Sequence, residues 1–217
     1  RAAADQELLD TLARREVGFD GFELAAEPRF GRRKVTYSLR DFAPYMEKKT
    51  LFALNWRFGG KTAREKQGHT EEKLNALFDE WIEKATDNNW VVPQGVMGIY
   101  PCQADGDEVV VYDPEDHSKE IARFDFTVVL GGEKKEYYHT VDSGQMSAIG
   151  IQLTTSGPQV DGFIEEMKAA GDSESTLFLQ GLSDRIAEDM AEHLHQQMRA
   201  LMGVNEKQGQ RWSPGYP

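Results

Sequence analysis

The spacing of hydrophobic residues along the chain predicts three amphipathic helices. Apolar residues between positions 74 and 82, after Thr70, recur at i, i+3 and i+4, as on the buried face of a helix. The same spacing predicts a helix over 160–170 and a longer one over about 175–202. The buried stripe of this longer helix is predicted to contain Leu182, Ile186, Met190, Leu194, Met198 and Leu201.

The middle of the chain changes to β-branched and aromatic residues, which favour strands. The turn sequence Ala104-Asp105-Gly106-Asp107 and the later Gly131-Gly132-Glu133 are typical of hairpin connections. Together these patterns predict an α+β fold with a central twisted, mainly antiparallel sheet flanked by helices. Besides a short strand at Val35-Thr36-Tyr37, the predicted strands cover 91–100, 108–112, 121–130 and 148–155.

The amino-terminal part is predicted to precede a single domain. Residues 1–34 comprise a segment rich in Ala, Leu and charge, which predicts a helix or arm, and then a polar connector. We assign residues 35–217 to the domain itself. Ser38 and Asp41 have the spacing of a capping box, which predicts that a short helix starts at Leu39 and runs to about Lys48. Asp41 therefore either caps a helix or presents a carboxylate to a ligand.

Composition and charge exclude several classes of function. The formal net charge of -12 argues against nucleic acid or an anionic membrane surface as a partner. The single cysteine, Cys102, excludes an internal disulfide framework, and it lacks the neighbours that activate a nucleophilic thiol. No apolar run approaches the roughly 18 residues of a membrane span and no signal-peptide segment is present, so we expect a cytoplasmic protein. Because the chain begins at Arg1, we also expect it to be a piece of something longer.

Two Glu-x-x-His motifs resemble metal-ligating patterns but do not have suitable geometry. Glu136 and His139 lie in a predicted strand, where residues three apart face opposite sides of the sheet. Glu192 and His195 lie on the predicted long helix, and His193 is roughly 200° from His195 around its axis. We therefore expect no metal site.

The chain ends on a compact motif, Arg211-Trp212-Ser213-Pro214-Gly215-Tyr216-Pro217. Proline fixes φ, and glycine permits backbone angles that other residues avoid, so the motif predicts a preorganised turn. The planar guanidinium of Arg211 suits a carboxylate. On these residues alone, a ligand-binding wall and an ordinary surface turn both remain open.

The Arg-x-x-x-Gly-Tyr-Pro pattern of this motif and other segments in the same order resemble one family. The chain is similar to the activation domain of cobalamin-dependent methionine synthase from about Val35 to Pro217. The other segments that carry the resemblance are Arg40–Tyr45, Gly95–Pro101 followed by Gly106–Tyr112, Ala148–Gln152 and Asp184–His195.

The resemblance implies a binding site for S-adenosylmethionine. It places Asp41 and Glu188 near the ligand amino group and Arg211 at the carboxylate, with Tyr216 at the mouth that faces the corrinoid. From spacing alone, Glu188 lies off the apolar stripe of its helix, which predicts only a solvated charge. Backbone groups of the Trp212 to Gly215 turn are implied to hold the adenosyl part. The complete predicted set is Asp41, Glu188, Arg211, Ser213, Gly215 and Tyr216, with binding and orienting roles and no general acid or base.

The activity that the resemblance implies is a repair reaction. Oxidised cob(II)alamin takes one electron, and the reduced cobalt then accepts the methyl group of S-adenosylmethionine, so the chain acts as a methyltransferase component that positions the donor. The chain has no Asp-x-His-x-x-Gly motif to ligate cobalt. A neighbouring cobalamin-binding domain or a separate corrinoid protein is therefore expected to carry the cofactor, with an electron donor such as flavodoxin.

Two alternatives remain open at this stage. The family often has a glutamate six residues before the motif arginine, where this chain has Asn205, and its best-known members continue past the Pro-Gly-Tyr-Pro turn. Besides the methionine synthase role, a reactivation module for a different corrinoid methyltransferase and a non-catalytic binding module that retains the fold therefore stay open.

Overall fold

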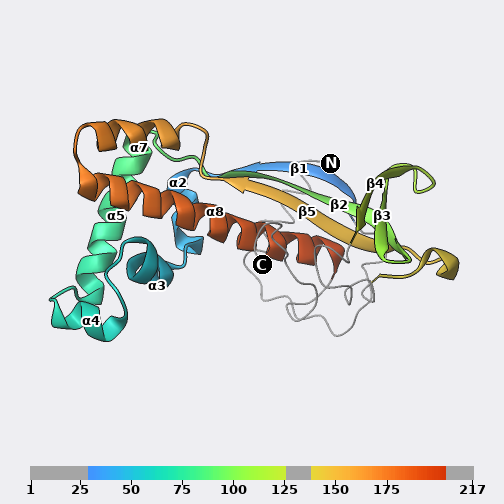
Figure 1. Ribbon diagram of the computed structural model, residues 1–217, viewed down its shortest axis with the longest axis horizontal. Helices are drawn as coiled ribbons and strands as arrows, with labels where there is room; N and C mark the ends of the chain where they lie inside the picture. The colour runs from blue at the N-terminus through green and yellow to red at the C-terminus, as the bar shows by residue number, and fades with distance from the viewer. Residues whose placement is uncertain (1–28, 126–137, 204–217) are drawn as a thin grey trace. The chain divides into compact units, whose positions relative to one another are not determined.

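The structure is a computed structural model that describes residues 29–125 and 138–203 (Figure 1). Its residue contacts divide into two compact units, which we describe separately. One comprises 34–96 and 153–193, and the other contains the described residues of 29–33, 97–152 and 194–203. The helices are α2 (Leu39–Phe42), η1 (Ala43–Tyr45), α3 (Lys48–Thr50), η2 (Leu51–Asn55), α4 (Lys61–Lys66), α5 (Glu71–Asp87), η4 (Val141–Ser143), α7 (Val160–Ala169) and α8 (Ser173–Met202).

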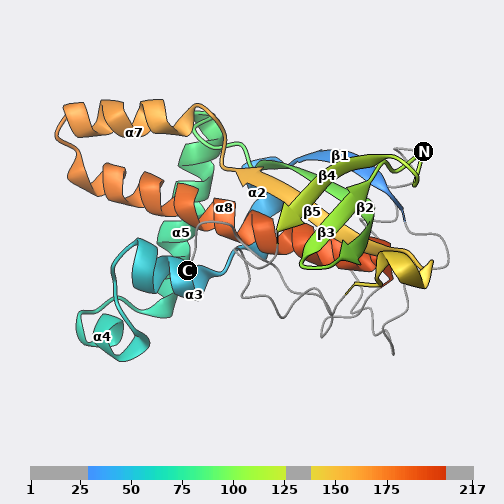
Figure 2. The same ribbon diagram turned by 45° about the vertical axis from the view of Figure 1, so that its right-hand side comes forward.

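The strands form a five-stranded sheet in the order β1-β2-β3-β4, with β5 also paired to β2. The pairs β2–β3 and β3–β4 are antiparallel, and Figure 2 shows them side by side. The β2–β3 hairpin turns after Asp105, where Gly106 has φ 60°, a left-handed conformation that favours glycine. The predicted α+β class with a mainly antiparallel sheet is confirmed. The strands are β1 (Gly31–Thr36), β2 (Gln94–Asp105), β3 (Glu108–Tyr112), β4 (Glu120–Asp125) and β5 (Ser147–Thr155).

In the unit that contains β3 and β4, a small apolar core forms around Cys102, Val109 and Val111. Tyr100 and Ile149 pack against this core. Burial raises the pKa of the Cys102 thiol well above its ordinary value, so the thiol stays neutral. Cys102 is therefore a buried core residue, in agreement with its lack of activating neighbours in the sequence.

The unit that contains α5 and α7 is built around large aromatic side chains. The indole N–H of Trp56 donates to the carbonyl of Phe178 at 3.0 Å, and the two rings lie 5.0 Å apart. Gly181 leaves room for this indole, because a Cβ at that position would lie 2.8 Å from Trp56 Cδ1. In both views α7 and the first part of α8 run side by side as a helical hairpin (Figures 1 and 2).

Most predicted elements are found within a few residues of their expected limits. Thr70 caps α5, and the predicted stripe of α8 is buried throughout. The predicted helix over 39–48 is wrong in its extent, because it breaks into α2, η1 and the start of α3. Pro44 lies in the first turn of η1, and since proline has no N–H, it cannot continue the hydrogen bonds of α2.

Some predictions concern residues outside the described part of the chain. They are the amino-terminal helix or arm, the second half of the strand over 121–130, the Gly131–Glu133 turn and the closing motif. The domain boundary after residue 34 likewise stays a prediction. Among the described residues, no helix combines the length and apolarity that a membrane span requires.

Candidate functional site

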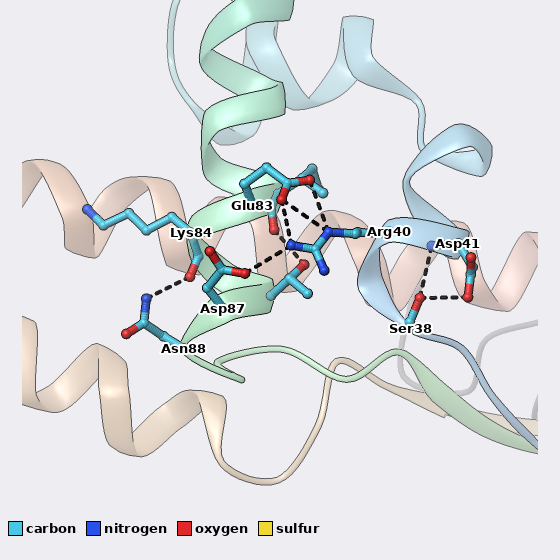
Figure 3. Close-up of polar contacts among 9 residues, drawn as sticks. Ser38, Arg40, Asp41, Glu83, Lys84, Asp87 and Asn88 are labelled. Atoms are coloured by element: carbon cyan, nitrogen blue, oxygen red, sulfur yellow. Dashed lines mark hydrogen bonds and ion pairs between the residues drawn. The ribbon is translucent and has the colours of Figure 1, made fainter.

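Asp41 lies in the one-turn helix α2 and is held by its capping residue. The backbone N–H of Asp41 donates to Ser38 Oγ at 3.1 Å, and this hydroxyl donates to Asp41 Oδ2 at 2.6 Å (Figure 3). In the usual capping box the acidic side chain accepts from the backbone of the capping residue, whereas here it accepts from the hydroxyl. Ser38 is therefore the residue that caps α2, Asp41 binds the capping hydroxyl and, among the described residues, no backbone N–H, and the Asp41 carboxylate is exposed at the surface.

A neighbouring arginine ties α2 to α5. Arg40 Nε lies 3.1 Å from both carboxylate oxygens of Glu83, and Nη2 lies 2.9 Å from Asp87 Oδ1 (Figure 3). Leu39 and Phe42 on the same turn are buried. The backbone that carries Asp41 is therefore anchored by apolar packing and by ion pairs on the surface.

Glu188 lies on α8 beside the apolar stripe, as its position in the sequence predicts. Its side chain is 57% exposed, and its Oε2 pairs with Arg185 Nη1 at 2.9 Å. The other end of the same guanidinium, Nη2, pairs with Asp189 Oδ1 at 2.7 Å. Arg185 and Asp189 are both largely buried, with side chains only 11% and 8% exposed.

The same face of α8 holds the segment that contains Asp41. Asp189 Oδ2 accepts a hydrogen bond from the backbone N–H of Glu47 at 2.8 Å. One turn further along α8, the His193 ring lies 4.4 Å from the ring of Tyr45 and 6.0 Å from that of Phe42. The two elements that carry Asp41 and Glu188 are thus joined directly.

Burial controls the ionisation of this contact region. Burial raises the pKa of Asp189, although the Glu47 N–H and the Arg185 guanidinium act in the opposite direction. Burial lowers the pKa of His193 to about 4, so its imidazole is neutral near pH 7. His193 Nε2 is also hydrogen-bonded to the Tyr37 hydroxyl at 2.9 Å.

The predicted site residues are placed only in part. Asp41 and Glu188 lie in the same compact unit, but no hydrogen bond or ion pair joins their described side chains. Arg211, Ser213, Gly215 and Tyr216 lie outside the described residues. The convergence of all six on one ligand therefore stays a prediction.

Comparison with known proteins connects this arrangement to a family. Residues 38–217 match the family described as "Vitamin B12 dependent methionine synthase, activation domain". The chain belongs to this family. The match begins at Ser38, the residue that caps the helix of Asp41, and it extends through the closing motif.

The fold also matches a solved structure entitled "Crystal Structure of the MetH Reactivation Domain bound to AdoHcy". The TM-score is 0.67 at 21% sequence identity, and the match covers 94% of this chain. At this identity the likeness shows a shared fold. The chain spans 66% of the length of that structure's chain.

Sequence analysis assigned no role in joining α8 to the Asp41 segment to Arg185, Asp189 or His193. They recur every four residues beside the apolar stripe of α8, and Gln197 continues the row. A polar row at this spacing next to an apolar stripe indicates side chains at the edge of a buried helix face. That signal was present in the sequence, but it does not say which other segment contacts the row.

Among the described residues, no group of three or more His, Cys, Asp or Glu side chains could hold a metal ion. His193 and His195 differ in their surroundings, since His193 is buried in an aromatic contact and His195 is half-buried. Glu136 lies outside the described residues, so the first Glu-x-x-His motif is not placed.

Proposed function

We propose that this chain binds S-adenosylmethionine and positions its methyl group for the reductive remethylation of cob(II)alamin in cobalamin-dependent methionine synthase. The family match over residues 38–217 carries this proposal. The bound AdoHcy of the structure with the same fold supports a related ligand here. In this role the chain is a methyltransferase component.

The described residues fit one end of such a ligand. An amino acid head group carries an ammonium and a carboxylate, so it requires acidic and basic groups around it. Asp41 and Glu188 present exposed carboxylates from elements that are joined through Asp189 and His193. We assign the ammonium to these two carboxylates.

The closing motif supplies the other end of the proposed site. Arg211 binds the ligand carboxylate, backbone groups of Ser213 and Gly215 hold the adenosyl part, and Tyr216 lies at the mouth. When bound, S-adenosylmethionine supplies the methyl group, and the residues of this chain bind and orient it without moving a proton. A preorganised turn suits this role because the ligand then orders few protein groups when it binds.

Cobalamin is the methyl acceptor in this proposal, and a partner carries it. The partner is either a cobalamin-binding domain or a separate corrinoid protein, and the electron comes from a donor such as flavodoxin. The cytoplasm is the proposed location. These assignments follow from the family and not from a contact in the structure.

Titration calorimetry with S-adenosylmethionine tests the binding step. We expect Asp41→Asn, Glu188→Gln and Arg211→Ala each to weaken binding about tenfold or more, since each removes a charge-assisted contact. Asp79→Asn, at a 73% exposed carboxylate on α5, is the matched control and should bind as the wild type does. A folded wild type that releases no heat would favour the non-catalytic binding module.

A reductant-coupled assay tests the acceptor. We expect the chain to support remethylation of the cobalamin of methionine synthase, and Arg211→Ala to abolish it at low S-adenosylmethionine. Remethylation only of another corrinoid protein would instead favour a reactivation module for that methyltransferase.

A further inference from the structure

We propose that Arg185 is a positioning residue that holds the Glu188 carboxylate in place for the ligand ammonium. This inference rests on the proposed function, because it concerns the same site. It adds a residue that does not itself contact the ligand.

The spacing on α8 lets one guanidinium reach two carboxylates. Glu188 and Asp189 follow Arg185 by three and four residues, so both side chains lie beside it on the helix surface. The Nη1 and Nη2 atoms take one carboxylate each, at 2.9 and 2.7 Å. A planar, rigid fork can serve two partners in this way, whereas the ammonium of lysine is a single point charge.

Burial differs across this cluster in a way that suits ligand binding. Arg185 and Asp189 are 11% and 8% exposed, while Glu188 is 57% exposed. Arg185 pairs with the Oε2 atom of Glu188, while more than half of the Glu188 side chain stays exposed to solvent. The carboxylate is thus oriented from its buried side and remains accessible to a cation.

Asp189 extends the cluster to the segment that follows Asp41. Its Oδ1 forms an ion pair with the Arg185 guanidinium and its Oδ2 accepts a hydrogen bond from Glu47 N–H, so both oxygens are engaged inside the protein. The formal charges of Arg185, Glu188 and Asp189 add to -1. Because Asp189 is buried, this negative charge is presented to a ligand through Glu188.

Calorimetry with S-adenosylhomocysteine tests this role. This ligand keeps the ammonium but lacks the sulfonium charge, so the contact with Glu188 is measured without a second cation. We expect Arg185→Lys to weaken binding about tenfold, because a point charge cannot hold both carboxylates. Arg123→Lys is the control, because Arg123 also pairs with several carboxylates (Glu120, Asp105 and Glu108) but at a more exposed position, and it should not weaken binding.

A double-mutant cycle distinguishes positioning from a general structural effect. If Arg185 acts through Glu188, Arg185→Lys should cause no further loss in a Glu188→Gln background. It should also leave unchanged the affinity for a deaminated analogue that retains the thioether and carboxylate. A loss of equal size in either case would overturn the proposal, as would wild-type affinity in a folded Arg185→Lys protein.

Arginine side-chain NMR gives a readout that needs no ligand. The fork predicts slowly rotating Nη groups on Arg185 whose signals shift in Glu188→Gln and in Asp189→Asn. Unchanged signals in Glu188→Gln would overturn the positioning role even if the ligand binds. A wild type whose Arg185 signals show both carboxylate contacts but which does not bind S-adenosylhomocysteine would instead overturn the proposed function. The positioning role of Arg185 toward the ligand would then fall with it.

Discussion

Two arginines of the same compact unit each contact two carboxylates, yet their surroundings differ. Arg185 and Asp189 are 11% and 8% exposed, whereas Arg40, Glu83 and Asp87 are 50%, 57% and 70% exposed. Water and salt screen the Arg40 cluster, so its charges interact weakly. Within the Arg185 cluster, Arg185 and Asp189 have lost most of their water while Glu188 is exposed, so removal of Asp189 leaves the buried guanidinium without a partner that water can readily replace.

The pKa shifts of the acidic partners show which effect dominates in each cluster. Hydrogen bonds from Arg40 lower the pKa of Glu83, because its exposed carboxylate loses little solvation. Burial raises the pKa of Asp189 even though Arg185 and the Glu47 N–H favour its charged form. The ion pairs of Arg40 therefore anchor the α2 turn at the surface, whereas those of Arg185 constrain a buried face of α8.

The largest expected effect is that of Asp189→Ala. It leaves the buried Arg185 without one partner and the Glu47 N–H without its acceptor, so we expect the free energy of unfolding to fall by about 3 to 5 kcal/mol. Chemical denaturation followed by circular dichroism measures this change. Asp79→Asn is the control, because its pairing with Lys48 is exposed at 3.9 Å. Equal effects of the two substitutions would contradict the comparison.

The next effect concerns His193 and pH. Its folded pKa of about 4 lies below the ordinary 6.5, so the unfolded chain binds the proton more tightly. Stability contributed by the neutral ring is complete above pH 6.5 and is lost as the pH falls toward 4, by on the order of 3 kcal/mol at most. Asp189, whose pKa is raised, acts in the opposite sense near its own pKa.

His193→Gln should flatten this part of the stability profile. The measurement is the free energy of unfolding at several pH values between 4 and 7 for both proteins. The control is His69→Gln, since His69 packs against Phe58 and is half-buried. An identical slope in His193→Gln and the wild type would show that another group dominates.

A smaller effect is expected from Ser38→Ala. The substitution removes the acceptor for the Asp41 N–H and the hydroxyl that binds the Asp41 carboxylate. Loss of a helix cap costs about 1 kcal/mol, and Ser38→Thr should restore most of it. Thermal unfolding measures the change, and a loss in Ser38→Thr as large as in Ser38→Ala would argue against the cap.

The smallest effect on stability is expected from Arg40→Gln. Because its ion pairs are exposed, the change should be smaller than that of Asp189→Ala and should disappear at about 1 M salt, where screening is nearly complete. Denaturation at low and high salt measures it. A change that persists in high salt would indicate that Arg40 acts through packing.

Local features of this protein were predictable because neighbouring residues decide them. The Ser38–Asp41 cap, the Gly106 turn and the apolar stripe of α8 each depend on residues a few positions apart. The break of the predicted 39–48 helix was also a local effect, but the prediction underestimated Pro44. The family resemblance was likewise carried by short motifs and is confirmed over residues 38–217.

By itself, the sequence determined most of the elements, the family and the solvated position of Glu188 beside the apolar stripe of α8. Only the tertiary structure decided which polar residues of α8 are buried and what they contact. Asp189 binds Glu47, and His193 binds Tyr37, across separations of 142 and 156 residues. Periodicity along one helix says which side chains share a face, but it carries no information about the distant segment that packs there. The roles of Asp189 and His193 in joining the two acid-bearing elements are therefore properties of the folded chain.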